Sequence, residues 1–238
     1  MAEWSGAKRF YKAATVIEGT AGLHVVALDG RSVKTPAGAE LGVESQALAV
    51  AMAAEWEAQE ETIDPHSMPL CKLSATTLDR LKVRRDEVIG ITLKIAETDL
   101  LCYRAEEPED LVARQQDSWQ PELDWAKQEL NAELAVTTGV LPINQPESAL
   151  IALQTALAEL DDYHLMGVTN AAAAAGSLIL AFSMFRGRID ADAMFEKSVL
   201  EEKHQMELWG EDYEALERHD RIRADIQDSA RFLKLLET

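Results

Sequence analysis

Cysteine is scarce in this sequence of 238 residues: there are only two, Cys71 and Cys102, far apart. No C-x-x-C pair occurs, which excludes a zinc ribbon and a thioredoxin-type redox motif. Both cysteines have apolar neighbours in the sequence, so we expect two buried free thiols. Unpaired thiols of this kind are consistent with a reducing compartment.

Basic residues are also in short supply. The chain has 23 Lys and Arg against 42 Asp and Glu, which gives a net charge of −19. Nucleic acid and anionic lipid repel such a chain, so we expect no nucleic-acid partner. The acidic surface serves solubility or attracts a basic partner.

Targeting and membrane signals are missing as well. The first residues, MAEWSGAKRFYKAATV, contain neither the apolar stretch of a secretory signal nor a long transit peptide rich in Arg and Ser. The segment 168–185 is long enough to span a bilayer, but seven of its residues are Ala or Gly and four are polar. We therefore predict a buried helix there and no membrane insertion.

Residues 8–43 contain short segments rich in Val, Ile, Thr and aromatic side chains, separated by turn signals. Asp29 and Gly30 between two apolar runs are typical of a β-hairpin, because a type I′ turn requires positive φ. With Arg31 they are predicted to be structural turn residues. We expect three or four antiparallel strands, which need a cover to be stable.

The segment 44–61 supplies that cover, because Leu48, Met52, Trp56 and Gln59 fall on one stripe at helical spacing. We expect Trp56 to be structural. Two prolines follow in IDPHSMPL, and the rest of the chain is mostly helical. The predicted fold is α+β, with a small β-rich domain over residues 1–66 and a larger helical domain over 67–238.

Two details of the helical part are specific enough to check. Val88, Ile91 and Ile95 are predicted to share one apolar helix face. Pro121 lies inside a helical pattern, where a kink or a break is expected.

The stretch LEEKHQMELWG, residues 200–210, poses the main question about function, because Glu201 and His204 have the spacing of a helical metal-ligand pair. On one continuous helical wheel, the core face holds Phe195, Val199, Met206 and Trp209. His204 falls on the opposite side, and no second E-x-x-H occurs. We therefore predict no metal and no cofactor.

Glu202, in contrast, falls in the middle of the predicted apolar face, where a carboxylate is costly unless it is paired. It could pair with an Arg or Lys inside the fold, or be an acid on a partner-binding surface. It could also be a general acid or base, since perturbed carboxylates occur in active sites. No G-x-S-x-G, P-loop, H-E-x-x-H or G-x-G-x-x-G motif supports a particular enzyme.

Six motifs occur together in order along nearly the whole chain. They are RFYK at 9–12, LDGRSVKTP at 28–36, AAEWEAQ at 53–59, ETDLLCYR at 97–104, Q-x-x-x-W-x-P-x-L-x-W from Gln115 to Trp125, and E-x-x-Q-x-x-x-W-G from Glu202 to Gly210. In this order they resemble the family of assembly chaperones that bind the α subunit of F-type ATP synthase.

The resemblance implies a protein that is not an enzyme, that binds the free α subunit, prevents its aggregation and releases it for assembly with β. It implies partner-binding roles for Glu202, Glu201, Gln205 and Trp209, and importance for Trp56. We expect a monomeric, cytoplasmic bacterial member, whose organellar relatives act in the mitochondrial matrix. The alternative is a small helical enzyme using Glu202 as acid or base, with or without a metal.

Overall fold

The computed structural model describes residues 4, 6–139, 141–210 and 212–237. The chain forms two compact units. The first takes the residues up to 85 together with 162–167 and those from 231 onward; the second takes 86–161 and 168–230. These units do not coincide with the division expected after residue 66. As a boundary between independently folding domains, that division stays a prediction.

A four-stranded antiparallel sheet forms one layer of the first unit. Its strands are β1 (Ala14–Glu18), β2 (His24–Leu28), β3 (Arg31–Ser32) and β4 (Gly42–Val43). The order is β1-β2-β3, with β4 also paired to β2. Antiparallel strands were predicted, and the turn between β2 and β3 has the expected positive φ, 48° at Asp29 and 80° at Gly30.

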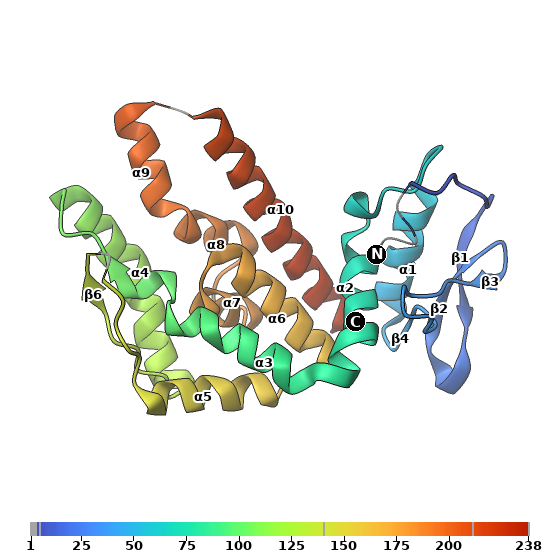
Figure 1. Ribbon diagram of the computed structural model, residues 1–238, viewed down its shortest axis with the longest axis horizontal. Coiled ribbons are helices and arrows are strands. Elements are labelled where there is room, and N and C mark those ends of the chain that lie inside the picture. The colour runs from blue at the N-terminus through green and yellow to red at the C-terminus, as the bar shows by residue number, and fades with distance from the viewer. Residues whose placement is uncertain (1–3, 5, 140, 211, 238) are drawn as a thin grey trace. The chain divides into compact units, whose positions relative to one another are not determined.

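Helix α1 (Gln46–Glu57) covers this sheet, as Figure 1 shows. The Ser45 hydroxyl accepts a hydrogen bond from the Leu48 amide and so caps the start of the helix. The predicted stripe is buried along its whole length, at Leu48, Met52, Trp56 and Gln59. Helix α2 (Pro69–Thr76) follows and packs on α1.

The remaining helices are α3 (Lys82–Glu97), α4 (Glu109–Glu129), α5 (Glu147–Ala158), α6 (Asp162–Ala175), α7 (Leu178–Phe185), α8 (Ala191–Ser198), α9 (Leu200–Trp209) and α10 (Tyr213–Leu236). A short parallel pair joins β5 (Tyr103–Arg104) to β6 (Thr137–Thr138). The model confirms the predicted class, a small antiparallel sheet with a helical cover and a larger helical part.

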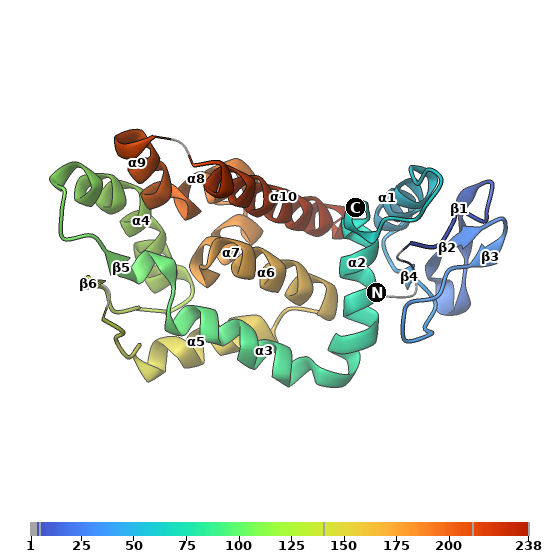
Figure 2. The ribbon, with the colours of Figure 1, turned by 45° about the horizontal axis from the view of Figure 1, so that its top comes forward.

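The core of the second unit is α7, whose first seven residues are all buried. In Figure 2, α6 and α7 lie between α10 on one side and α3 and α5 on the other. The segment 168–185 was predicted to be one helix. It is two, because the chain turns at Gly176 (φ 66°) and Ser177 caps α7. None of the described helices combines the length and the apolarity needed to cross a membrane.

Two predicted details of the helical part were wrong or incomplete. Ile91 is 54% exposed, and the buried positions of α3 are Ile89, Thr92 and Ala96. Pro121 does not end its helix, because α4 continues to Glu129.

Candidate functional site

The predicted orientation of α9 was wrong, and the reason is a break in the chain that the helical wheel ignored. Helix α8 ends at Ser198, and Val199 has φ −112° and ψ 15°, outside the helical region. A continuous helical wheel drawn from Phe195 through Val199 therefore gives wrong angular positions for the residues of α9. His204, placed on the solvent side, is buried and is the one buried residue of α9.

His204 and Glu201 both contact α4. The His204 Nε2 lies 2.9 Å from the Asp110 Oδ2, and this contact lowers the pKa of Asp110. The Gln115 amide donates to the Glu201 carboxylate at 3.4 Å. The side chains of the E-x-x-H pair thus hold α9 against α4. Within the described part of the chain, no group of three or more His, Cys, Asp or Glu could hold a metal ion.

Glu202 is held by two residues of α10. Its Oε1 accepts a hydrogen bond from the Arg218 guanidinium at 2.7 Å, and its Oε2 lies 2.9 Å from the His219 Nε2. His219 is buried and its ring meets Phe195 edge-on, whereas the Glu202 side chain is 30% exposed. Glu202 is therefore an ion-paired carboxylate at the surface, not the buried acid that the wheel predicted.

An open groove of about 500 Å³ lies beside this carboxylate, between the end of α9 and the start of α10. Its lining includes Glu202, Gln205 and Trp209, three of the four predicted partner-binding residues. Trp209 was expected in the core but is 79% exposed. Leu208 and Tyr213 beside it are 58% and 73% exposed.

Four exposed apolar residues lie at the end of α9 and the start of α10. We call them the α9–α10 tip: Leu208, Trp209, Tyr213 and Leu216. Four exposed acidic residues adjoin it in the sequence, Glu207, Asp212, Glu214 and Glu217, and Glu207 is paired with Arg114. The nearby cation Arg218 is paired with Glu202. The fourth predicted residue, Glu201, faces α4 instead. The role of all four in partner binding stays a prediction.

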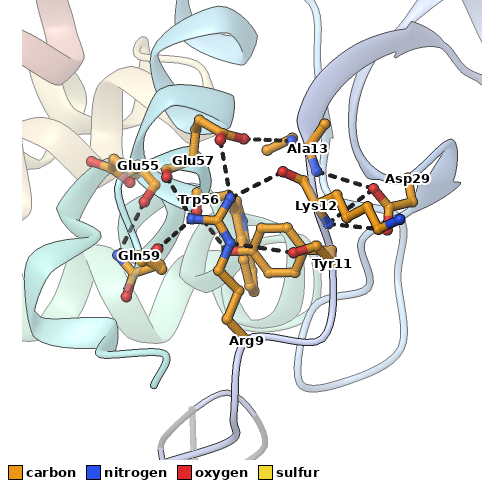
Figure 3. Close-up of polar contacts among 10 residues, drawn as sticks. Arg9, Tyr11, Lys12, Ala13, Asp29, Glu55, Trp56, Glu57 and Gln59 are labelled. Atoms are coloured by element: carbon orange, nitrogen blue, oxygen red, sulfur yellow. Dashed lines mark hydrogen bonds and ion pairs between the residues drawn. The ribbon is translucent and has the colours of Figure 1, made fainter. Parts of the chain in front are cut away.

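The other predicted site residues belong to the first unit, where Trp56 and Asp29 make stabilising contacts and the structural role of Arg31 stays a prediction. The Trp56 ring meets Trp4 and Tyr11 edge-on, with centroids 5.3 and 5.9 Å away, and the Tyr11 hydroxyl donates to the Trp56 carbonyl at 2.5 Å. Asp29 anchors the hairpin turn, because its carboxylate accepts hydrogen bonds from the Lys12 and Ala13 amides. Figure 3 shows the hydrogen bonds of Tyr11 and Asp29.

The neighbours of Trp56 in the AAEWEAQ motif fasten the next segment of the chain. The buried Glu55 carboxylate accepts hydrogen bonds from the Leu70 and Cys71 amides, both at 2.9 Å, at the start of α2. Gln59 bonds the Asp64 amide and the Ser67 hydroxyl. Burial raises the pKa of Glu55, while the two amide hydrogen bonds oppose that shift.

Sequence reasoning missed the partners of the candidate residues and one buried charge cluster. Glu122 in α4 is 3% exposed, and its carboxylate bonds Ser183, Arg188 and Lys197. No motif signals Glu122, and no sequence spacing links His219 to Glu202. Both cysteines are buried and free, as predicted, and burial raises the pKa of Cys102 to about 12.

Comparison with solved structures shows the same fold over nearly the whole chain. Atp12 from Paracoccus denitrificans superposes with a TM-score of 0.90 at 37% identity, over 97% of this chain and 98% of that one. The Atu1473 protein of Agrobacterium tumefaciens gives a TM-score of 0.90 at 37% identity, over 96% and 86%. The Agrobacterium protein is described as a putative chaperone, so the shared fold is that of a chaperone class.

The sequence comparisons agree and name the family. The model for the ATP12 chaperone protein matches residues 8–127. The mitochondrial protein atp12 of Schizosaccharomyces pombe is 25% identical over 228 residues, which cover 90% of this chain and 78% of that protein. The chain belongs to the ATP12 family of ATP synthase assembly chaperones.

Proposed function

We propose that this protein binds the free α subunit of F-type ATP synthase, prevents its aggregation and hands it on for assembly with β. The observation that carries the proposal is the α9–α10 tip, where the exposed Trp209 lines a groove together with the ion-paired Glu202 and with Asp212. An exposed tryptophan with apolar neighbours is a typical anchor of a protein–protein contact.

The chemistry of the tip fits a client surface that carries both apolar and basic groups. Apolar contact with Trp209 and Tyr213 supplies affinity, and the surrounding carboxylates attract Lys and Arg and set the register of the contact. Since these charges are exposed, salt screens them, and the charged part of the contact weakens as salt rises.

The direct test uses purified α subunit diluted from denaturant, with light scattering to follow its aggregation. We expect the wild-type protein to suppress aggregation and Trp209→Ser to lose most of this activity. Ile151→Ser is the matched control, because Ile151 is also exposed and lies outside the tip. Equal protection by the wild type and Trp209→Ser would refute the proposed surface.

We also propose that the protein acts without catalysis and without a cofactor, as a monomer, in the cytoplasm of a bacterium. The enzyme alternative needs Glu202 within reach of a histidine, and His219 meets that condition. However, Arg218 occupies the other carboxylate oxygen, so both oxygens are already engaged. The openness of the groove and the exposure of Trp209 favour a binding surface.

A further inference from the structure

A second cavity, of about 510 Å³, lies in the first unit, and its lining residues differ from those proposed to bind the client. It is formed by three of the motifs that the α9–α10 tip does not use: RFYK, LDGRSVKTP and AAEWEAQ. Aromatic side chains make much of its wall, at Trp4, Phe10, Tyr11 and Trp56, and Arg31 and Lys34 also line it.

The floor of this cavity is fixed by contacts on several sides. Tyr11 is buried, its hydroxyl bonds the Trp56 carbonyl, and the Arg9 guanidinium lies 4.7 Å from its ring centroid. Arg9 is itself held by Glu57, whose Oε1 lies 3.0 Å from the Arg9 Nη2, as Figure 3 shows. A floor fixed in this way loses little conformational entropy when it binds a ligand.

The rim, by contrast, is exposed. Phe10 is 73% exposed even though its ring meets Tyr11 edge-on, and the Arg31 side chain has no ion-pair partner among the residues that the structure describes. The opening of the cavity thus presents an exposed phenylalanine ring and a guanidinium that has no ion-pair partner in the described part of the chain. Both groups are suited to contact a ligand that carries apolar and acidic groups.

The local charge is opposite to that of the whole chain. Of the three charged residues that line the cavity, Arg31 and Lys34 are basic and Asp29 is acidic, whereas the net charge of the chain is −19. The Asp29 carboxylate accepts hydrogen bonds from the Lys12 and Ala13 amides. Lys34 lies 4.0 Å from Glu40 and remains 56% exposed. The opening is therefore positive, and it complements an acidic ligand.

We propose that this cavity is a second docking site, and that its occupant is an acidic peptide segment of a partner protein. A large apolar side chain of that segment enters the cavity and packs on the exposed Phe10 ring, and a carboxylate beside it pairs with Arg31. The site differs in sign from the α9–α10 tip, where the proposed client surface is basic. It therefore extends the proposed function and does not depend on it.

The test measures binding of short labelled peptides to the full chain by fluorescence anisotropy. The first peptide has a central Phe-Leu pair flanked by Glu; in the second, Lys replaces Glu; in the third, Ser-Ser replaces the apolar pair. We expect binding of the first peptide only. Phe10→Ser and Arg31→Glu should each weaken it about tenfold or more, the loss typical of a central contact.

Two exposed residues of the same unit provide matched controls. Val83→Ser removes an apolar side chain that is 78% exposed, and Lys82→Glu reverses a charge, both outside the cavity. Neither should change peptide binding. The proposal is overturned if no peptide binds, if the Lys peptide binds as well as the Glu peptide, or if the cavity variants bind like the controls.

Trp209→Ser separates this proposal from the function proposed above. It should leave peptide binding intact while it abolishes protection of the α subunit. Loss of peptide binding in Trp209→Ser would place the peptide at the α9–α10 tip and overturn the second site. Melting temperatures of all variants show whether a loss of binding is due to unfolding.

Discussion

Glu, Trp and Gln occur together twice in this protein, at Glu55 and Trp56 in α1 with Gln59 just after its cap, and at Glu202, Gln205 and Trp209 in α9. In the first set every residue is at most 7% exposed. In the second set Trp209 is 79% exposed, and Glu202 is paired at the surface. The residue types are the same, but burial gives the first set a structural role and leaves the second available to a partner.

The hydrogen bonds of the two sets show the same contrast. Glu55 and Gln59 bond backbone groups of the following segment, which fixes the path of the chain. Glu202 bonds the side chains of Arg218 and His219, which connect α9 to α10. Glu55 bonds backbone amides and so helps to fix where α2 begins. Glu202 bonds side chains of α10 and so helps to position the exposed residues of α9.

The largest effect is expected for Trp56→Ala. Removal of a fully buried Trp costs about 3–5 kcal/mol of unfolding free energy, and here it also removes the edge-on contacts with Trp4 and Tyr11. Urea unfolding measures the loss. Trp209→Ala is the matched control and should change stability by less than about 0.5 kcal/mol, because its ring is exposed. Equal losses would contradict the structural distinction between the two sets.

The second effect concerns Asp99, a fully buried carboxylate that bonds the amides of Leu101 and Ile179. Burial raises its pKa from 3.8 to about 6. The native state therefore binds the proton more tightly than the unfolded state. The contribution of Asp99 to stability is fully present below about pH 4 and is lost as the pH rises through about 6.

The shift of about two pKa units corresponds to about 3 kcal/mol in total, of which about 1 kcal/mol falls between about pH 5 and pH 7. We measure urea unfolding of the wild type and of Asp99→Asn across that interval. The wild type should lose about 1 kcal/mol relative to the variant as the pH rises. Taking the difference removes the effect of the other acidic residues, and a parallel pH dependence would show that Asp99 does not titrate there.

The third prediction tests the capping role of Glu55. Glu55→Gln keeps the shape of the side chain, but one of the two backbone amides at the start of α2 then faces the NH₂ group of Gln and loses its hydrogen-bond acceptor. A buried donor without an acceptor costs about 1–3 kcal/mol of unfolding free energy. The exposed Glu44→Gln is the control, with no change expected beyond about 0.5 kcal/mol. Hydrogen exchange at the Leu70 and Cys71 amides locates the effect, and unchanged protection there would argue against this role.

Local sequence signals predicted the first unit well. The Asp29-Gly30 turn and the stripe of α1 depend on near neighbours in the chain, and both were confirmed. The orientation of α9 was missed because it depends on the single non-helical residue Val199. Partners such as Arg218 and His219 are brought to Glu202 by helix packing, for which the sequence gives no periodic signal.

The smallest effect on stability is expected for Glu202→Gln, which tests the exposed set directly. A half-exposed ion pair contributes at most about 1 kcal/mol, and the Gln carbonyl oxygen still accepts a hydrogen bond from His219. The melting temperature should stay near that of the wild type. Protection of the α subunit should nevertheless weaken, because the charge next to Trp209 is lost, and it should weaken further as salt screens the remaining carboxylates.

Lys203 lies on the same helix but bonds Glu196, so Lys203→Gln controls for a change of charge on α9 outside the groove. A fall in melting temperature with protection intact would show that Glu202 serves the fold, as Glu55 does, and would remove the distinction between the two sets.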